Sequence, residues 1–131
     1  MAVTGIDTQE SVVKAVNKGT LHITEPDLSG LLSQVVQKKS LTAQSTTKKA
    51  DTFIIAVPTP FKENKVPDLS FVLTAISMIT PHLTKDNLVI IESTCPVGTS
   101  QEAYKNILNQ RPDLKGHIHI AYCPERVLPG R

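Results

Sequence analysis

Short runs of aliphatic residues, separated by longer segments with helical periodicity, constrain the fold of this chain most. Three such runs cover residues 53–57 (FIIAV), 88–91 (LVII) and 118–122 (IHIAY). Strand-length apolar runs that alternate with helical segments predict a parallel sheet with crossover helices. The uninterrupted apolar character of residues 53–57 and 88–91 also predicts strands that are buried on both faces of the sheet.

The first part of the chain continues this alternation. Residues 2–6 (AVTGI) form a strand-like run that ends at Asp7, and residues 9–18 have apolar positions at helical spacing, with Gly19 where a C-terminal cap belongs. A second helix is predicted to start near Pro26, and residues 41–45 form a brief strand. The predicted order is β-α-α-β-β-α-β-α-β, an α/β fold.

Three places in the sequence have the spacing of helix N-caps. Asp68 precedes an apolar helical pattern over residues 69–79 and is predicted to cap that helix. Thr99 and Glu102 have capping-box spacing after Gly98, and so do Asp7 and Glu10 after the first strand.

Composition excludes several classes of protein. The net charge is +2, and the lysines are scattered without aromatic residues between them, so the chain does not resemble a nucleic-acid-binding domain. No apolar run approaches the ~20 residues that a membrane span needs, and no signal peptide is recognisable. The two cysteines, Cys95 and Cys123, have no disulfide or metal-site spacing, which favours a reducing, cytoplasmic location and predicts no metal.

Polar residues follow the carboxyl ends of the predicted strands, where parallel sheets bind ligands. Asp7 ends the first strand, and its carboxylate could accept hydrogen bonds from both hydroxyls of a ribose, although a plain helix cap explains it as well. Val57, Pro58 and Thr59 end another strand in a turn stiffened by proline, which suits packing against a flat cofactor or is simply a loop.

The next two strand ends carry similar candidates. Glu92, Ser93 and Thr94 precede a helix and could hold an amide, a phosphate or a water, or could only satisfy the amides of a turn. Glu125 could act as a base or orient a substrate hydroxyl, and it could equally form a surface pair with Arg126.

Taken together, these loops resemble one family. The segments GID, HITEPDL, AVPTPF, VPDLSFV, ESTCPVG and AYCPERVLPG are similar to the UDP-glucose/GDP-mannose dehydrogenases over almost the whole chain. Within the family, HITEPDL and CPERVLPG resemble the branch that oxidises UDP-N-acetyl-D-mannosamine. Arg126 and Pro129 depart from the pattern of the UDP-glucose enzymes, which remain the alternative.

The resemblance implies a Rossmann-type domain and the oxidation of a UDP-sugar C6 hydroxyl to a carboxylate with two NAD⁺, by way of an aldehyde and a cysteine thioester. It implies that Asp7 binds the adenosine ribose, that Val57, Pro58 and Thr59 line the cofactor, and that Thr94 positions nicotinamide or a catalytic water beside Glu92 and Ser93. It further implies that Glu125 assists water or proton handling. Substrate contacts would come from Arg126, Val127 and Leu128.

The family pattern also begins with a strand and a glycine-rich turn, and continues to a nucleophilic cysteine, none of which is recognisable in residues 1–131. We therefore expect an incomplete NAD-binding domain of a longer, homo-oligomeric parent, and expect that these residues alone bind NAD weakly and turn over no substrate. A non-catalytic half-Rossmann binding module is the alternative from a different class.

Overall fold

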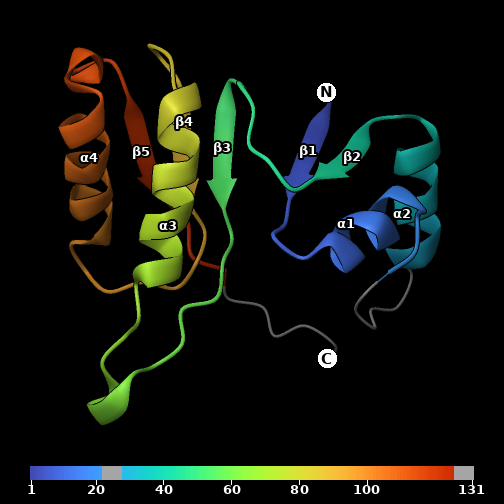
Figure 1. The fold of residues 1–131 in the computed structure, drawn as a ribbon, viewed down its shortest axis with the longest axis horizontal. Coiled ribbons are helices and arrows are strands. Elements are labelled where there is room, and N and C mark those ends of the chain that lie inside the picture. The colour runs from blue at the N-terminus through green and yellow to red at the C-terminus, as the bar shows by residue number, and fades with distance from the viewer. Residues whose placement is uncertain (22–27, 126–131) are drawn as a thin grey trace. The chain divides into compact units, whose positions relative to one another are not determined.

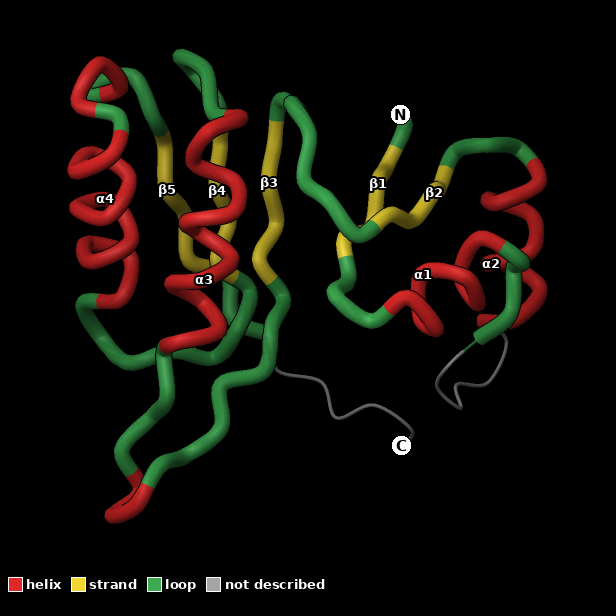
Figure 2. Tube along the Cα trace, viewed as in Figure 1, coloured by secondary structure: helices red, strands yellow, loops and turns green. Residues whose placement is uncertain are grey.

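The computed structural model describes residues 1–21 and 28–125, and the chain divides into two compact units (Figures 1 and 2). The first unit takes in Met1–Thr47 and the second begins at Lys48. The first contains, in chain order, β1 (Val3–Ile6), α1 (Glu10–Asn17), α2 (Leu28–Gln37) and β2 (Leu41–Gln44). The second contains β3 (Thr52–Ile55), α3 (Ser70–Ile79), β4 (Leu88–Ile91), α4 (Thr99–Gln110) and β5 (His119–Tyr122). Three short 3₁₀ turns, Glu63–Lys65, Thr80–His82 and Pro112–Leu114, also lie in the second unit.

The second unit is a three-stranded parallel sheet in the order β3-β4-β5. Consecutive strands are neighbours joined by helices, as the alternating pattern predicts. Both helices contribute to a single aliphatic core with the sheet, and Figure 1 shows α3 and α4 on the same side of the strands. Its fully buried members include Val72, Ile76, Val89, Ile91 and Ile107.

The prediction that these strands are buried on both faces is wrong. Side chains of β3 alternate between buried and exposed, and Ile54 is 61% exposed between the buried Phe53 and Ile55. Alternate residues of a strand point to opposite faces, and α3 and α4 cover only one of them. An apolar run therefore marks the strand correctly without showing how many layers cover it.

The first unit is smaller and has a sparser core. β1 and β2 pair in parallel, with Val3 opposite Leu41 and Ile6 opposite Gln44. Of the apolar face predicted for α2, Leu32 is buried whereas Leu31 is 56% exposed. Pro26, the predicted start of this helix, lies outside the described residues.

Gly19 ends α1 as predicted. The Gly19 amide donates to Val16 at 2.8 Å and the Thr20 amide donates to Ala15 at 2.9 Å, the two bonds of a Schellman cap. Gly19 has φ of 70°, and a Cβ there would lie 3.1 Å from the Cα of Ser33, so both conformation and space require glycine.

The predicted capping boxes are wrong. Gln9, not Asp7, is the N-cap of α1, and Gly98, not Thr99, is the N-cap of α4. Thr99 lies inside its helix and donates to the Pro96 carbonyl at 2.9 Å. Capping depends on which residue leaves helical backbone angles, and side-chain spacing alone does not reveal that.

Asp68 behaves closer to prediction. Its Oδ1 accepts the amide of Ser70, the first residue of α3, at 2.9 Å, although Leu69 is the N-cap residue. No helix among the described residues is long and apolar enough to cross a membrane.

Candidate functional site

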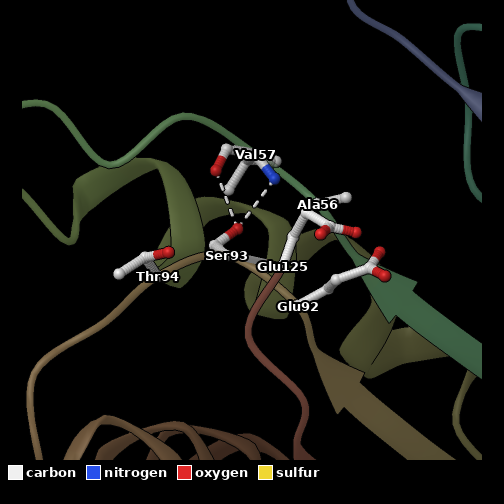
Figure 3. A pocket seen from close by; sticks show the side chains of 6 residues that line it. All are labelled: Ala56, Val57, Glu92, Ser93, Thr94 and Glu125. Atoms are coloured by element: carbon white, nitrogen blue, oxygen red, sulfur yellow. Dashed lines mark hydrogen bonds between the residues drawn. The ribbon is translucent and has the colours of Figure 1, made fainter. Parts of the chain in front are cut away.

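A hollow of about 270 Å³ opens at the carboxyl ends of the strands in the second unit (Figure 3). Parallel strands present their carboxyl ends at one edge, so the loops after β3, β4 and β5 meet there. The hollow is lined by Ala56, Val57, Glu92, Ser93, Thr94 and Glu125. Five of these six residues are site candidates from the sequence, and they come from three separate loops.

The buried Ser93 hydroxyl joins the first two of these loops. It donates to the Val57 carbonyl at 2.7 Å and accepts the Val57 amide at 2.9 Å (Figure 3). The strand hydrogen bonds of β3 end at Ile55, whose carbonyl accepts the amides of Glu92 and Ser93. Val57, predicted inside the strand, is thus held by a side chain after the strand has ended.

A second hollow, of about 470 Å³, lies next to the first and shares Thr94 with it. It is lined by Thr59, Phe61, Pro67, Thr94, Cys95 and Pro96. The Thr59 hydroxyl donates to the Thr94 carbonyl at 2.8 Å, which fixes the two loops beside each other. The exposed Thr94 side chain therefore stands where the two hollows meet.

Glu125 is brought to the site by continued pairing between β4 and β5. Beyond the strands, the Cys123 amide donates to the Ile91 carbonyl at 2.9 Å and the Glu125 amide donates to the Glu92 carbonyl at 3.1 Å. Glu92 and Glu125 thus line the same hollow from adjacent loops.

The charge of the first hollow is negative. Its described lining contains two carboxylates and no lysine, arginine or histidine. Such a lining repels a phosphate and attracts a cationic ring or the hydroxyl of a sugar. The chemistry that it can support is hydrogen bonding and proton transfer by carboxylate and hydroxyl groups.

Cys95 borders the second hollow, but it is a weak nucleophile. Partial burial raises the pKa of its thiol, so the reactive thiolate is scarce at neutral pH. Both Cys95 and Cys123 are free thiols.

Asp7 lies in the first unit, directly after β1. Its Oδ1 accepts the Gln9 amide at 2.8 Å, and its own amide donates to the Gln44 carbonyl at 3.3 Å. The half-buried carboxylate is thereby fixed at the carboxyl end of its strand without acting as the helix cap.

The remaining candidates are placed less directly. Pro58 follows Val57 but does not line either hollow. Arg126, Val127 and Leu128 lie outside the described residues. In the described ranges 1–21 and 28–125, no group of three or more His, Cys, Asp or Glu side chains could hold a metal ion.

Sequence reasoning missed one polar residue of this region, Tyr122. Its phenol oxygen accepts the Cys95 amide at 3.1 Å and donates to the Cys95 carbonyl at 3.2 Å. A tyrosine at the end of a strand is ordinary, and only the register, with Tyr122 opposite Ile91, shows that it reaches the neighbouring loop.

Comparisons with known proteins show which enzymes this chain is similar to. The UDP-N-acetyl-D-mannosamine dehydrogenase of Escherichia coli K12 is 42% identical over 137 residues, covering 98% of this chain and 33% of that protein. An NDP-N-acetyl-D-galactosaminuronic acid dehydrogenase of Ralstonia nicotianae is 43% identical, covering 98% of this chain and 32% of that protein. The chain thus spans about a third of the length of these curated relatives.

Solved structures give the same result. The native UDP-N-acetyl-mannosamine dehydrogenase of Staphylococcus aureus matches with a TM-score of 0.92 and 34% identity, over 99% of this chain and 32% of that one. The Rossmann-type α/β fold expected from the sequence is confirmed by this match. The model of the NAD-binding domain of the UDP-glucose/GDP-mannose dehydrogenases matches residues 1–131, and the chain therefore belongs to this family of NAD-dependent nucleotide-sugar dehydrogenases as its NAD-binding domain.

Proposed function

We propose that this chain provides the NAD-binding domain of an enzyme that oxidises the C6 hydroxyl of UDP-N-acetyl-D-mannosamine to the uronic acid, with two NAD⁺ for each sugar. The similarity to the UDP-N-acetylmannosamine dehydrogenases of Escherichia coli and Staphylococcus aureus supports this substrate. The observation that best supports an oxidation of this type is the negatively charged hollow at the strand ends, which Glu92, Thr94 and Glu125 line together.

The residues present fit parts of NAD that differ in charge. The first hollow suits nicotinamide, because Glu92 and Glu125 line it and would attract the cationic oxidised ring, whereas the pyrophosphate would be repelled there. When bound, NAD⁺ accepts the hydride from C6. The hydroxyl of Thr94 would hold the carboxamide or a water. Val57 and Thr59, which line the two hollows, would form the wall against which the cofactor packs, and Pro58 would stiffen the turn between them.

Glu125 handles the proton in this proposal. Removing hydride from an alcohol carbon also requires a proton to leave its hydroxyl, and a carboxylate at the rim of the hollow can accept it directly or through water. Ser93 is close to the cofactor but acts on the protein, because its hydroxyl is already bonded to both polar groups of Val57. Arg126, Val127 and Leu128 contact the nucleotide sugar.

Asp7 selects NAD over NADP in this proposal, since a carboxylate accepts both ribose hydroxyls and repels a 2′-phosphate. Asp7→Asn tests this, because an amide oxygen still accepts the Gln9 amide, whereas the charge and one of the two acceptor oxygens are lost. We expect the preference for NAD⁺ over NADP⁺, measured as a ratio of kcat/KM, to fall about tenfold. An unchanged ratio of kcat/KM for the two cofactors would show that Asp7 does not contact the cofactor.

The function is tested in the protein expressed from its complete gene. We expect two NADH per UDP-N-acetyl-D-mannosamine, measured by absorbance, and less activity with UDP-glucose or UDP-N-acetyl-galactosamine. Glu125→Gln should lower kcat about 100-fold or more, in the range of general base catalysis, and should weaken NAD⁺ binding by a much smaller factor, because the carboxylate of Glu92 still lines the hollow. Glu102→Gln, on the exposed side of α4, is the matched control.

Three results would argue against the proposal. Formation of one NADH per sugar would show that the second oxidation step does not occur. Faster turnover of UDP-glucose would show that UDP-glucose, not UDP-N-acetyl-D-mannosamine, is the substrate. Binding of NAD⁺ without oxidation of any UDP-sugar would favour a non-catalytic binding domain.

A further inference from the structure

Tyr122 makes an unusual two-point contact with the loop that follows β4. Its phenol oxygen accepts the amide of Cys95 at 3.1 Å and donates to the carbonyl of the same residue at 3.2 Å. A hydroxyl can donate one hydrogen bond and accept two, so this single group satisfies both backbone positions of Cys95.

The register of the sheet explains the reach of this side chain. Tyr122 is the last residue of β5 and lies opposite Ile91, the last residue of β4. Cys95 lies four residues beyond Ile91 along the chain, so the loop must turn back toward the sheet edge to meet the phenol. The hydroxyl of Tyr122 is the group that holds the backbone of that turn.

Thr94 and both of its neighbours in the chain are held by hydrogen bonds to other segments of the chain. Ser93, on one side, is bonded through its hydroxyl to Val57, and the carbonyl of Thr94 itself accepts the Thr59 hydroxyl at 2.8 Å. Three consecutive residues are therefore tied to other parts of the structure, and the exposed side chain of Thr94 projects from a fixed backbone between the two hollows.

We propose that Tyr122 is a positioning residue, which acts through the Cys95 peptide to fix the Thr94 hydroxyl toward the nicotinamide end of the site. This inference rests on the proposed function for the role of Thr94, whereas the contact with Cys95 stands independently of it. A misplacement of about 1 Å in a catalytic group can cost two orders of magnitude in rate, so a tie on the neighbouring peptide has a measurable effect.

Tyr122→Phe is the direct test, because it keeps the ring and removes only the hydroxyl. Tyr104→Phe is the matched control, since the Tyr104 hydroxyl accepts a backbone amide as well, that of Gly116 at 3.2 Å, away from both hollows. Both variants are made in the protein expressed from its complete gene. Hydrogen exchange of the 94–96 segment and steady-state kinetics are measured for each.

We expect Tyr122→Phe to exchange the Cys95 amide about tenfold faster, the loss of one modest hydrogen bond, and to lower kcat about tenfold with the melting temperature near that of Tyr104→Phe. Alkylation of Cys95, followed by peptide mass spectrometry, should also accelerate relative to Cys123. Tyr104→Phe should change exchange only near Gly116 and leave kcat within about twofold.

The outcomes separate this inference from the proposed function. Wild-type exchange and kcat in Tyr122→Phe would overturn the positioning role and leave the function intact. Faster exchange with unchanged kcat would show that the phenol orders the loop but does not position Thr94, which also overturns the inference. A wild-type protein that oxidises no UDP-sugar would contradict the proposed function, while the exchange result would still decide whether Tyr122 holds the loop.

Discussion

The hydroxyl of Ser93 forms hydrogen bonds with both backbone groups of Val57, as a neighbouring strand would. It donates to the Val57 carbonyl at 2.7 Å and accepts the Val57 amide at 2.9 Å (Figure 3). β3 has already ended at Ile55, so no strand pairing is available to these two backbone groups. One buried side chain thereby closes the wall of the strand-end hollow.

Ser93→Ala should destabilise the protein by about 1–3 kcal/mol, because a partly buried donor and acceptor lose their partner together. Chemical denaturation measures this loss. Ser77→Ala, on the exposed side of α3, is the control and should stay within about 0.5 kcal/mol of wild type. Equal stability of the two variants would mean that water replaces the Ser93 hydroxyl without cost.

Asn17 protects the outer edge of β2 in the first unit. Its side-chain amide donates to the Ala43 carbonyl and its side-chain oxygen accepts the Ala43 amide, both at 2.8 Å. Asn17→Ala removes both bonds and leaves an open strand edge, which is a site for association between chains. We expect the exchange of the Ala43 amide to accelerate about tenfold and light scattering to show more association.

Asn17→Asp is the informative control for this edge. It keeps an oxygen that accepts the Ala43 amide, and it replaces the donor to the Ala43 carbonyl by a carboxylate oxygen that cannot donate and repels that carbonyl. Protection of the Ala43 amide should therefore persist in Asn17→Asp and disappear in Asn17→Ala. The same loss of protection in both variants would contradict the assignment of the two bonds.

The sequence predicts elements better than it predicts their ends and their contacts. The run at Leu88–Ile91 matches its strand, and Gly19 caps α1, because apolar periodicity and positive φ each have a direct signature in residue type. The predicted capping boxes were wrong because residue type and spacing do not show which backbone group a side chain will bond. Asp7 and Thr99 have the right spacing, but their hydrogen bonds go to Gln9 and Pro96.

The site shows the same division. Glu92, Thr94 and Glu125 could be predicted to meet because the carboxyl ends of parallel strands share one edge. Tyr122 could not, since its role depends on the register of β5 and on a turn that brings Cys95 back to it. Residue types are enough to predict which edge of the sheet carries the site. Predicting a contact between two loops also requires the path of the backbone in each loop.

Asp68 should contribute stability that depends on pH. The pKa of its carboxyl is lowered, first by the hydrogen bond from the Ser70 amide, with Lys62 at 3.2 Å as a smaller cause. A lowered folded-state pKa means that the stabilisation is present above the unfolded-state pKa, which is about 3.9, and is lost as the pH falls toward the folded-state value.

Asp68→Asn should therefore have a lower melting temperature than wild type at pH ~7, and the difference should shrink as the pH falls through the lowered pKa of the Asp68 carboxyl. Lys62→Met should keep most of the pH dependence, because it leaves the bond from Ser70 in place. A larger effect of Lys62→Met than of Asp68→Asn would reverse the order of the two causes.

Lys39 ends α2 in a conformation that a glycine would adopt more easily. It has φ of 54°, and the amides of Lys39 and Ser40 donate to Val36 and Val35, both at 2.9 Å, in the pattern that Gly19 makes after α1. A side chain in the left-handed region costs about 1–2 kcal/mol, which exceeds the ~0.5–1 kcal/mol of extra entropy that glycine loses on folding. Lys39→Gly should therefore stabilise the protein by about 0.5–1 kcal/mol in chemical denaturation. Lys38→Gly is the control, because it removes the same charge one residue earlier, where positive φ is not needed, and it should destabilise the protein. If both substitutions increased the free energy of unfolding, the cause would be the removal of charge and not the relief of backbone strain.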